Sequence, residues 1–144
     1  MQFFPSTQTK KQTEAFIIKM QNQYAKKGFC YFAVDLLKTK QCIGFIGLSE
    51  QIYESDFTPA IDIGWRLHPN FWNKGYATEG AKRCLEFGFH HLKLEKIIAV
   101  APKINLPSIA VVKKIGMKKV KEFRHPLLLN HPKIENCVLF EIKR

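Results

Sequence analysis

One short segment combines a glycine, a cation and a predicted helix start. Residues 72–79 read Trp-Asn-Lys-Gly-Tyr-Ala-Thr-Glu, between a predicted strand and a helical pattern. The first turn of a helix presents unpaired N–H groups and partial positive charge, which favour a phosphate. Gly75 lets the backbone approach an anion, Ala77 keeps that approach clear, and Lys74 adds a positive charge. A glycine before a helix is also an ordinary turn, and spacing alone leaves both interpretations open.

Two other residues are candidates for proton transfer. Asp62 stands in an apolar strand pattern, where burial would raise its pKa and make it a candidate general base. Its alternative is a solvated or lysine-paired strand residue. His125 precedes a proline near a predicted strand end, where it could shape an acceptor pocket, act as an alternate base or be structural.

Metal chemistry has no support in the pattern. The four cysteines, at positions 30, 42, 84 and 137, are widely spaced and form no CxxC pair. We therefore expect free thiols and no metal site.

The elements that must position these residues alternate between strand and helix patterns. Helices are predicted over residues 9–26, 76–91 and 105–115, the first with a capping box of Thr9 and Gln12. Strands are predicted over 29–37, 41–48, 60–67, 96–101, 117–123 and 136–143, and residues 49–58 are predicted to form a loop. This order favours a mixed α/β fold, and the 144-residue length favours one domain over residues 1–144.

The net charge of +11 indicates an anionic partner, either a phosphorylated cofactor or a nucleic acid. Zinc-finger, RNP and KH patterns are all missing from the sequence, which disfavours the nucleic acid. The first nine residues lack the order of a signal peptide, and no long apolar stretch suits a membrane span. A cytoplasmic protein without a membrane partner is the resulting expectation.

The segment around Gly75 resembles the pyrophosphate-binding motif of the GNAT superfamily of N-acetyltransferases, Gln/Arg-x-x-Gly-x-Gly/Ala. Trp72 stands at its first position, as in the RimJ/RimL-type branch, and Gly75 and Ala77 match the rest. The resemblance continues in consistent order from about residue 29 to 143. The matching segments are residues 43–48, 61–67, 105–108, 114–117, 123–126 and 138–140.

The resemblance implies a GNAT fold, with a central, mostly antiparallel, twisted sheet of about six strands flanked by helices. It implies acetyl-CoA as co-substrate, with its pantetheine arm between the splayed third and fourth strands. Asn105 would contact that arm, although its residue type equally suits a helix N-cap. The implied cofactor-binding set is Trp72, Asn73, Lys74, Gly75, Tyr76, Ala77, Thr78, Asn105 and Ser108.

The implied reaction is direct acetyl transfer to a primary amine, either a protein N-terminus, as on a ribosome-associated substrate, or a small molecule. Asp62 matches an acidic position where the branch usually has Glu, so the shorter side chain would act through water. Val112 stands where many members have an acidic Tyr. Ser108 matches a serine whose hydroxyl could contact the cofactor sulfur, or it simply starts a helix. The candidate catalytic residues are Asp62, Ser108 and His125.

Family members usually begin with a further strand and helix before the segment that matches residues 1–6. We therefore expect another subunit to fill the gap, an open acceptor site, or an inactive form. A homodimer is one such arrangement. The alternatives to an enzyme are a non-catalytic acyl-CoA-binding module and a basic nucleic-acid-binding protein.

Overall fold

The chain alternates helices and strands in the predicted order. A computed structural model describes residues 9–144, so the N-terminal segment considered above for a signal peptide lies largely outside the described residues. The elements are α1 (Lys10–Lys27), β1 (Tyr31–Asp35), β2 (Cys42–Gln51), β3 (Ala60–Leu67), η1 (Pro69–Phe71), α2 (Tyr76–His90), β4 (Lys96–Pro102), α3 (Leu106–Lys114), β5 (Lys118–Arg124) and β6 (Asn136–Lys143).

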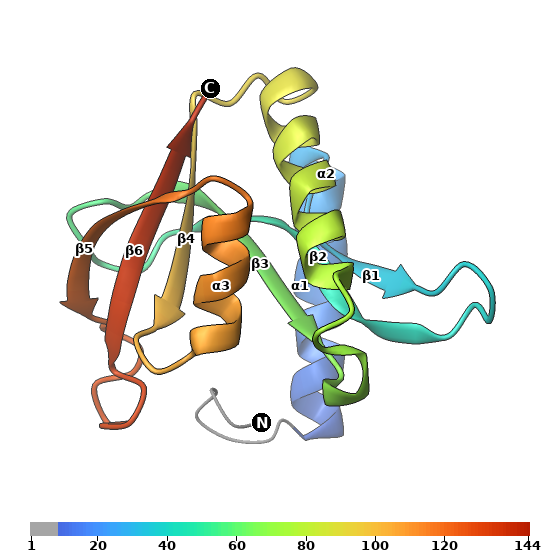
Figure 1. Cartoon of the computed structure of the whole chain (residues 1–144), viewed down its shortest axis with the longest axis horizontal. Helices are drawn as coiled ribbons and strands as arrows, with labels where there is room; N and C mark the ends of the chain where they lie inside the picture. Colours follow the sequence, from blue (N-terminus) through green and yellow to red (C-terminus); the bar gives the residue numbers. More distant parts are fainter. Residues whose placement is uncertain (1–8) are drawn as a thin grey trace.

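Six strands form one sheet in the order β1-β2-β3-β4-β6-β5. Every neighbouring pair is antiparallel except β3 and β4, which run parallel. Figure 1 shows the sheet twisted, with β1 and β5 at its two edges. The predicted mixed α/β fold, with a mostly antiparallel six-stranded sheet, is confirmed.

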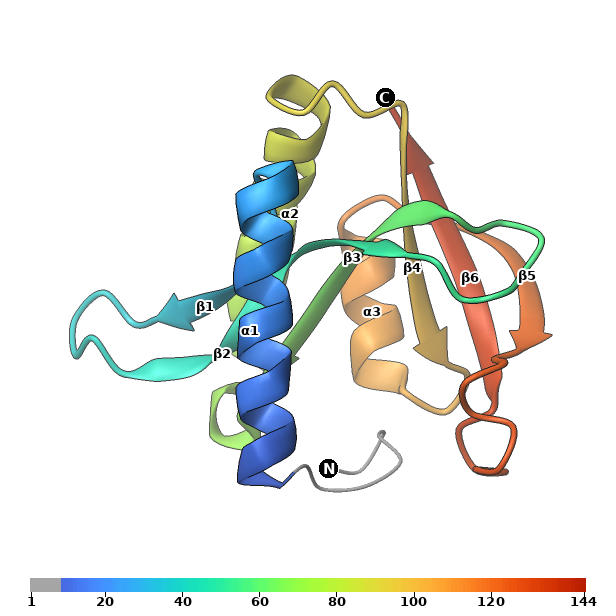
Figure 2. The same ribbon diagram turned by 180° about the vertical axis from the view of Figure 1, so that it is seen from behind.

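The helices lie on both faces of the sheet. α2 and α3 cover one face, and α1 crosses the opposite face (Figures 1 and 2). The main core lies under α2 and α3, where Ile63 packs with Ala81, Leu85, Ile97 and Val112. Alternation along β3 then directs Asp62 and Gly64 towards the α1 side.

α1 is packed more loosely than the other helices. Thr9 and Gln12 form the predicted capping box, and Gly28 ends the helix in the left-handed conformation. Met20 is the one buried residue of the helix. A largely apolar groove of about 1050 Å³ runs between α1 and the β1–β2 hairpin.

The predicted loop over residues 49–58 begins too early. β2 continues to Gln51, and Ser49 pairs with Asp62 across the β2–β3 ladder. The reason is tertiary: the Ser49 hydroxyl donates a 2.9 Å hydrogen bond to Oε1 of Gln23 on α1. The hydrogen bond pairs a polar group at the end of β2, so the strand continues through residues whose sequence is typical of a loop.

The four cysteines are free thiols, and Cys30 and Cys137 are buried. In residues 9–144 we find no cluster of three or more His, Cys, Asp or Glu side chains that could hold a metal ion. No helix within the same range has the length and apolar character needed to span a membrane.

Candidate active site

The loop before α2 turns through two left-handed residues. Asn73 has φ 59° and Gly75 has φ 82°, and a Cβ built on Gly75 would meet no atom within 4 Å. The first helical bond joins the amide of Glu79 to the carbonyl of Gly75. No side chain of the described residues caps this end. The amides of the first turn therefore have no acceptor within the helix.

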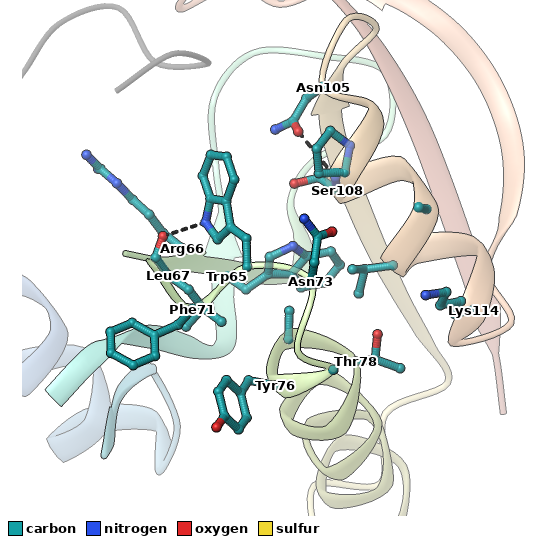
Figure 3. Close-up of a pocket in the computed structure, with 16 residues that line it drawn as sticks. Trp65, Arg66, Leu67, Phe71, Asn73, Tyr76, Thr78, Asn105, Ser108 and Lys114 are labelled. Atoms are coloured by element: carbon teal, nitrogen blue, oxygen red, sulfur yellow. Dashed lines mark hydrogen bonds between the residues drawn. The ribbon is translucent and has the colours of Figure 1, made fainter. Parts of the chain in front are cut away.

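A cavity of about 310 Å³ opens at this helix start. Figure 3 shows Tyr76 and Thr78 at the start of α2, with Asn105 and Ser108 at the start of α3, around it. Predicted residues in the lining are Trp72, Asn73, Gly75, Tyr76, Ala77, Thr78, Asn105 and Ser108. Lys74 is exposed and is not among the lining residues.

Sequence reasoning missed seven of the sixteen residues that line the cavity. These residues come from the end of β3, from η1 and from one face of α3. They are Trp65, Arg66, Leu67, Phe71, Pro107, Ala110 and Val111, and Lys114 also lines the cavity. The helical spacing of residues 107, 111 and 114 was the signal that could have found the α3 wall.

Trp72 fixes the loop to the end of β3. Its indole Nε1 donates a 2.8 Å hydrogen bond to the carbonyl oxygen of Leu67. The indole therefore joins the strand end to the loop, a structural role that its place in the motif did not predict.

Asn105 has the geometry of a helix cap. Its Oδ1 accepts a 3.2 Å hydrogen bond from the amide of Ser108, drawn as a dashed line in Figure 3. The residue is buried and also lines the cavity. The N-cap interpretation is confirmed.

The sheet divides next to the cavity. β3 and β4 form one register pair, Asp62 with Ile98, and the described residues beyond it make no further pair between these strands. Figure 1 shows the two arrowheads pointing apart on either side of α3. Asp62 thus lies where the strands separate, about 10 Å along β3 from Trp65 at the usual strand rise.

The carboxylate of Asp62 is enclosed, although the residue as a whole keeps a little accessible surface. Its Oδ1 accepts a 2.5 Å hydrogen bond from the phenol of Tyr31. Burial raises the pKa of Asp62 to about 6, while hydrogen bonds from Tyr31 and Gln51 act in the lowering direction. The partner is a tyrosine, so the lysine-paired alternative is wrong.

His125 lies apart from the cavity. Its ring packs at 4.4 Å from Tyr53 and 5.8 Å from Phe123, and its Nδ1 accepts from the amide of Leu127 at 3.1 Å. Burial lowers the pKa of His125. Val112 is buried in the core, so α3 offers no acid at that position.

The comparison with known families decides the identity of this fold. The family described as Acetyltransferase (GNAT) domain matches residues 1–118. The chain belongs to the GNAT acetyltransferase family. The cavity at the start of α2 is accordingly where the GNAT resemblance located the cofactor.

Two GNAT relatives extend this result. The chain is 38% identical over 117 residues to an uncharacterized N-acetyltransferase, YnaD, of Bacillus subtilis, covering 81% of this chain. The match spans 64% of that relative, so the chain covers less than two thirds of its length. A GNAT-family acetyltransferase of Bacillus anthracis superposes with a TM-score of 0.79 at 29% identity, over 99% of this chain and 80% of the other.

A solved structure of lower sequence identity shares the fold alone. The ribosomal-protein-S5-alanine acetyltransferase of Vibrio fischeri superposes with a TM-score of 0.78 at 20% identity, over 98% of this chain and 78% of the other.

Proposed function

We propose that this protein is an acetyl-CoA-dependent N-acetyltransferase that acts on a primary amine. The observation that carries the proposal is the cavity at the uncapped start of α2, next to the division between β3 and β4. Membership in the GNAT family and the N-acetyltransferase relatives support the same activity.

The residues of the cavity fit a pyrophosphate. The amides of Tyr76, Ala77 and Thr78 and the open space over Gly75 can hold phosphate oxygens. Asn73, in the left-handed conformation, also lines the cavity, and Lys114 adds a positive charge to the same wall. The net charge of +11 favours an anionic ligand in general.

Acetyl-CoA, when bound, supplies an acetyl group activated as a thioester. Asp62 takes, through one water, the proton that the amine nitrogen loses as it bonds to the acetyl carbon. The hydroxyl of Ser108 gives a proton to the sulfur as the carbon–sulfur bond breaks and regains one from solvent, to which Asp62 releases the proton it took. The products are an N-acetylated amine and a free thiol, so protons and electrons balance.

The acceptor is a protein N-terminal amine or a small-molecule amine. The ribosomal-protein-S5-alanine acetyltransferase supports the first class through its fold. His125 and its aromatic neighbours belong to the loop region in which an acceptor site would vary.

Turnover on an amine panel tests the function. Peptides with free N-terminal alanine or serine and a set of small amines are incubated with acetyl-CoA, and acetylated products are measured by mass spectrometry. We expect Asp62→Asn to lower kcat by about 10²-fold or more, as for loss of a general base. The exposed Asp35→Asn is the matched control and should leave kcat unchanged.

Binding of acetyl-CoA without turnover on any amine would instead assign the acyl-CoA-binding alternative. If acetyl-CoA does not bind and nucleic acid binds with a steep salt dependence, the protein would instead be the basic nucleic-acid-binding protein.

A further inference from the structure

Tyr31 connects two strands that are not neighbours. Its hydroxyl, on β1, donates to Oδ1 of Asp62 on β3 at 2.5 Å. The same hydroxyl accepts a 3.2 Å hydrogen bond from Nε2 of Gln51 on β2. Because a phenol has one proton to donate, its orientation is fixed by these two partners.

Two aromatic side chains pack against the ring of Tyr31. It stacks on Phe45 with ring centroids 5.4 Å apart and an interplanar angle of 22°. Phe16 of α1 lies against it at 6.5 Å. The hydroxyl therefore reaches Asp62 from a ring whose rotation is restricted by aromatic packing.

Two glycines leave room for this crossing. Tyr31 pairs with Gly47 of β2, and Gly47 pairs with Gly64 of β3, so the three residues form one lateral row. A Cβ on Gly64 would come within 3.0 Å of Cε1, Cζ and Oη of Tyr31. A side chain larger than hydrogen at Gly64 would thus press on the part of the ring that carries the hydroxyl.

The other groups that face Asp62 leave Tyr31 as its closest donor. Ser49, opposite on β2, donates its hydroxyl to Gln23 of α1. Burial raises the pKa of Tyr53, beyond the end of β2, and its electrostatic interaction with Asp62 raises that pKa further.

The neighbour of Asp62 on β4 is apolar. Ile98, the β4 partner of Asp62, is buried and brings no donor to the carboxylate.

We propose that Tyr31 is a positioning residue for Asp62, holding its carboxylate in one orientation where β3 and β4 divide. This inference rests on the proposed function, in which Asp62 is the base. Tyr31 itself touches neither the cavity residues around Gly75 nor, in this proposal, the acetyl group. It acts by fixing the direction of the carboxylate and by favouring its ionised form.

The test is Tyr31→Phe, which keeps the ring and removes the one hydroxyl. The chain has only three aspartates, at positions 35, 56 and 62, so carboxyl-13C aspartate labelling with Asp62→Asn as reference assigns the Asp62 signal. We expect the NMR titration midpoint of Asp62 to rise by about one unit when this donor to the charged form is lost. Tyr24→Phe, which alters an exposed tyrosine of α1, is the matched control and should leave the midpoint unchanged.

Kinetics give the second measurement. In Tyr31→Phe, the acid limb of the kcat/KM pH profile should shift to higher pH by the same amount as the NMR midpoint of Asp62. At neutral pH, kcat should fall about tenfold while the KM for acetyl-CoA stays constant. A Tyr31→Phe protein whose Asp62 midpoint equals that of the wild type overturns the inference, whatever its activity.

The inference is also overturned if Tyr31→Phe shifts the NMR midpoint of Asp62 but leaves the acid limb of the kcat/KM profile unchanged. The hydrogen bond would then contribute to stability and not to catalysis. A wild-type protein without turnover on any amine would contradict the proposed function. The NMR midpoint would still show whether the hydrogen bond from Tyr31 lowers the pKa of Asp62.

Discussion

The ring of Tyr31 lies so close to Gly64 that a Cβ at residue 64 would stand 3.0 Å from three of its atoms. These residues are two strands apart in the sheet, with Gly47 of β2 between them. The absence of a side chain at Gly64 is therefore what allows the phenol to reach the carboxylate of Asp62.

Gly64→Ala is expected to destabilise the protein by about 1–3 kcal/mol, the usual cost of inserting a methyl group into a packed site. Tyr31→Ala removes the opposing ring, so the double variant should lose less stability than the sum of the two single variants. Urea unfolding of the four proteins measures both effects. Strict additivity would show that the methyl group meets something other than the ring.

Gly75 and Gly28 provide a matched pair for the acetyl-CoA site. Both have left-handed φ values, 82° and 79°, and a Cβ at either would meet no atom within 4 Å. Gly75→Glu and Gly28→Glu should therefore carry similar backbone strain, about 1 kcal/mol. Only Gly75 lines the cavity at the start of α2.

Thermal unfolding with and without acetyl-CoA separates the two variants. A ligand that binds the native state raises Tm by mass action. We expect that rise in the wild type and in Gly28→Glu, and its loss in Gly75→Glu, where the new carboxylate repels phosphate. An equal rise in both variants would move the cofactor away from this loop.

Asp62 should make stability depend on pH. Burial raises its pKa from 3.8 to about 6, so the folded state holds this proton more tightly than the unfolded state. The stabilising contribution is fully present below about pH 4 and is lost as pH rises through about 6. Above that range the buried carboxylate opposes folding.

Asp62→Asn should therefore be more stable than the wild type by about 1–3 kcal/mol at pH 8, with the difference vanishing near pH 4. The asparagine Oδ1 can still accept from Tyr31, which keeps the comparison local. Urea unfolding at several pH values measures the trend. A difference that is independent of pH would contradict the raised pKa.

Asn105 caps α3 and lines the cavity at its start. Asn105→Ala removes the cap on the Ser108 amide and should cost about 1 kcal/mol of stability, whereas Asn105→Ser keeps a capping oxygen and should cost only a few tenths. If the Asn105 amide also contacts the cofactor, Asn105→Ser should bind acetyl-CoA more weakly despite its near-normal Tm. Calorimetric titration with acetyl-CoA checks this, and unchanged affinity would leave Asn105 a cap alone.

Much of the fold was predictable because its signals are local. Helical and alternating apolar patterns gave the order of the elements, and the cap of α1 was evident from Thr9 and Gln12. The polar end of β2 was not predictable, because the hydroxyl of Ser49 donates its hydrogen bond to Gln23, which is 26 positions away on α1. No pattern within a short window contains that partner.

The loop and first turn at residues 72–78 could be recognised from sequence because a helix start presents its amides through contiguous residues. The α3 wall and the end of β3 were assigned to the cavity only by the structure, since their approach depends on how β3 and β4 divide. His125 was a candidate by residue type, and the structure adds that its ring packs against Tyr53 and Phe123.

The sequence by itself determined the family, the order of helices and strands, and the amides at the start of α2, because each depends on neighbouring residues. Only the tertiary structure decided the partner of Asp62. A carboxylate in a strand has the same sequence pattern whether lysine, water or tyrosine faces it. Strand register and two glycines bring Tyr31 to Asp62 across 31 residues of sequence, and burial then raises the pKa of the carboxyl group.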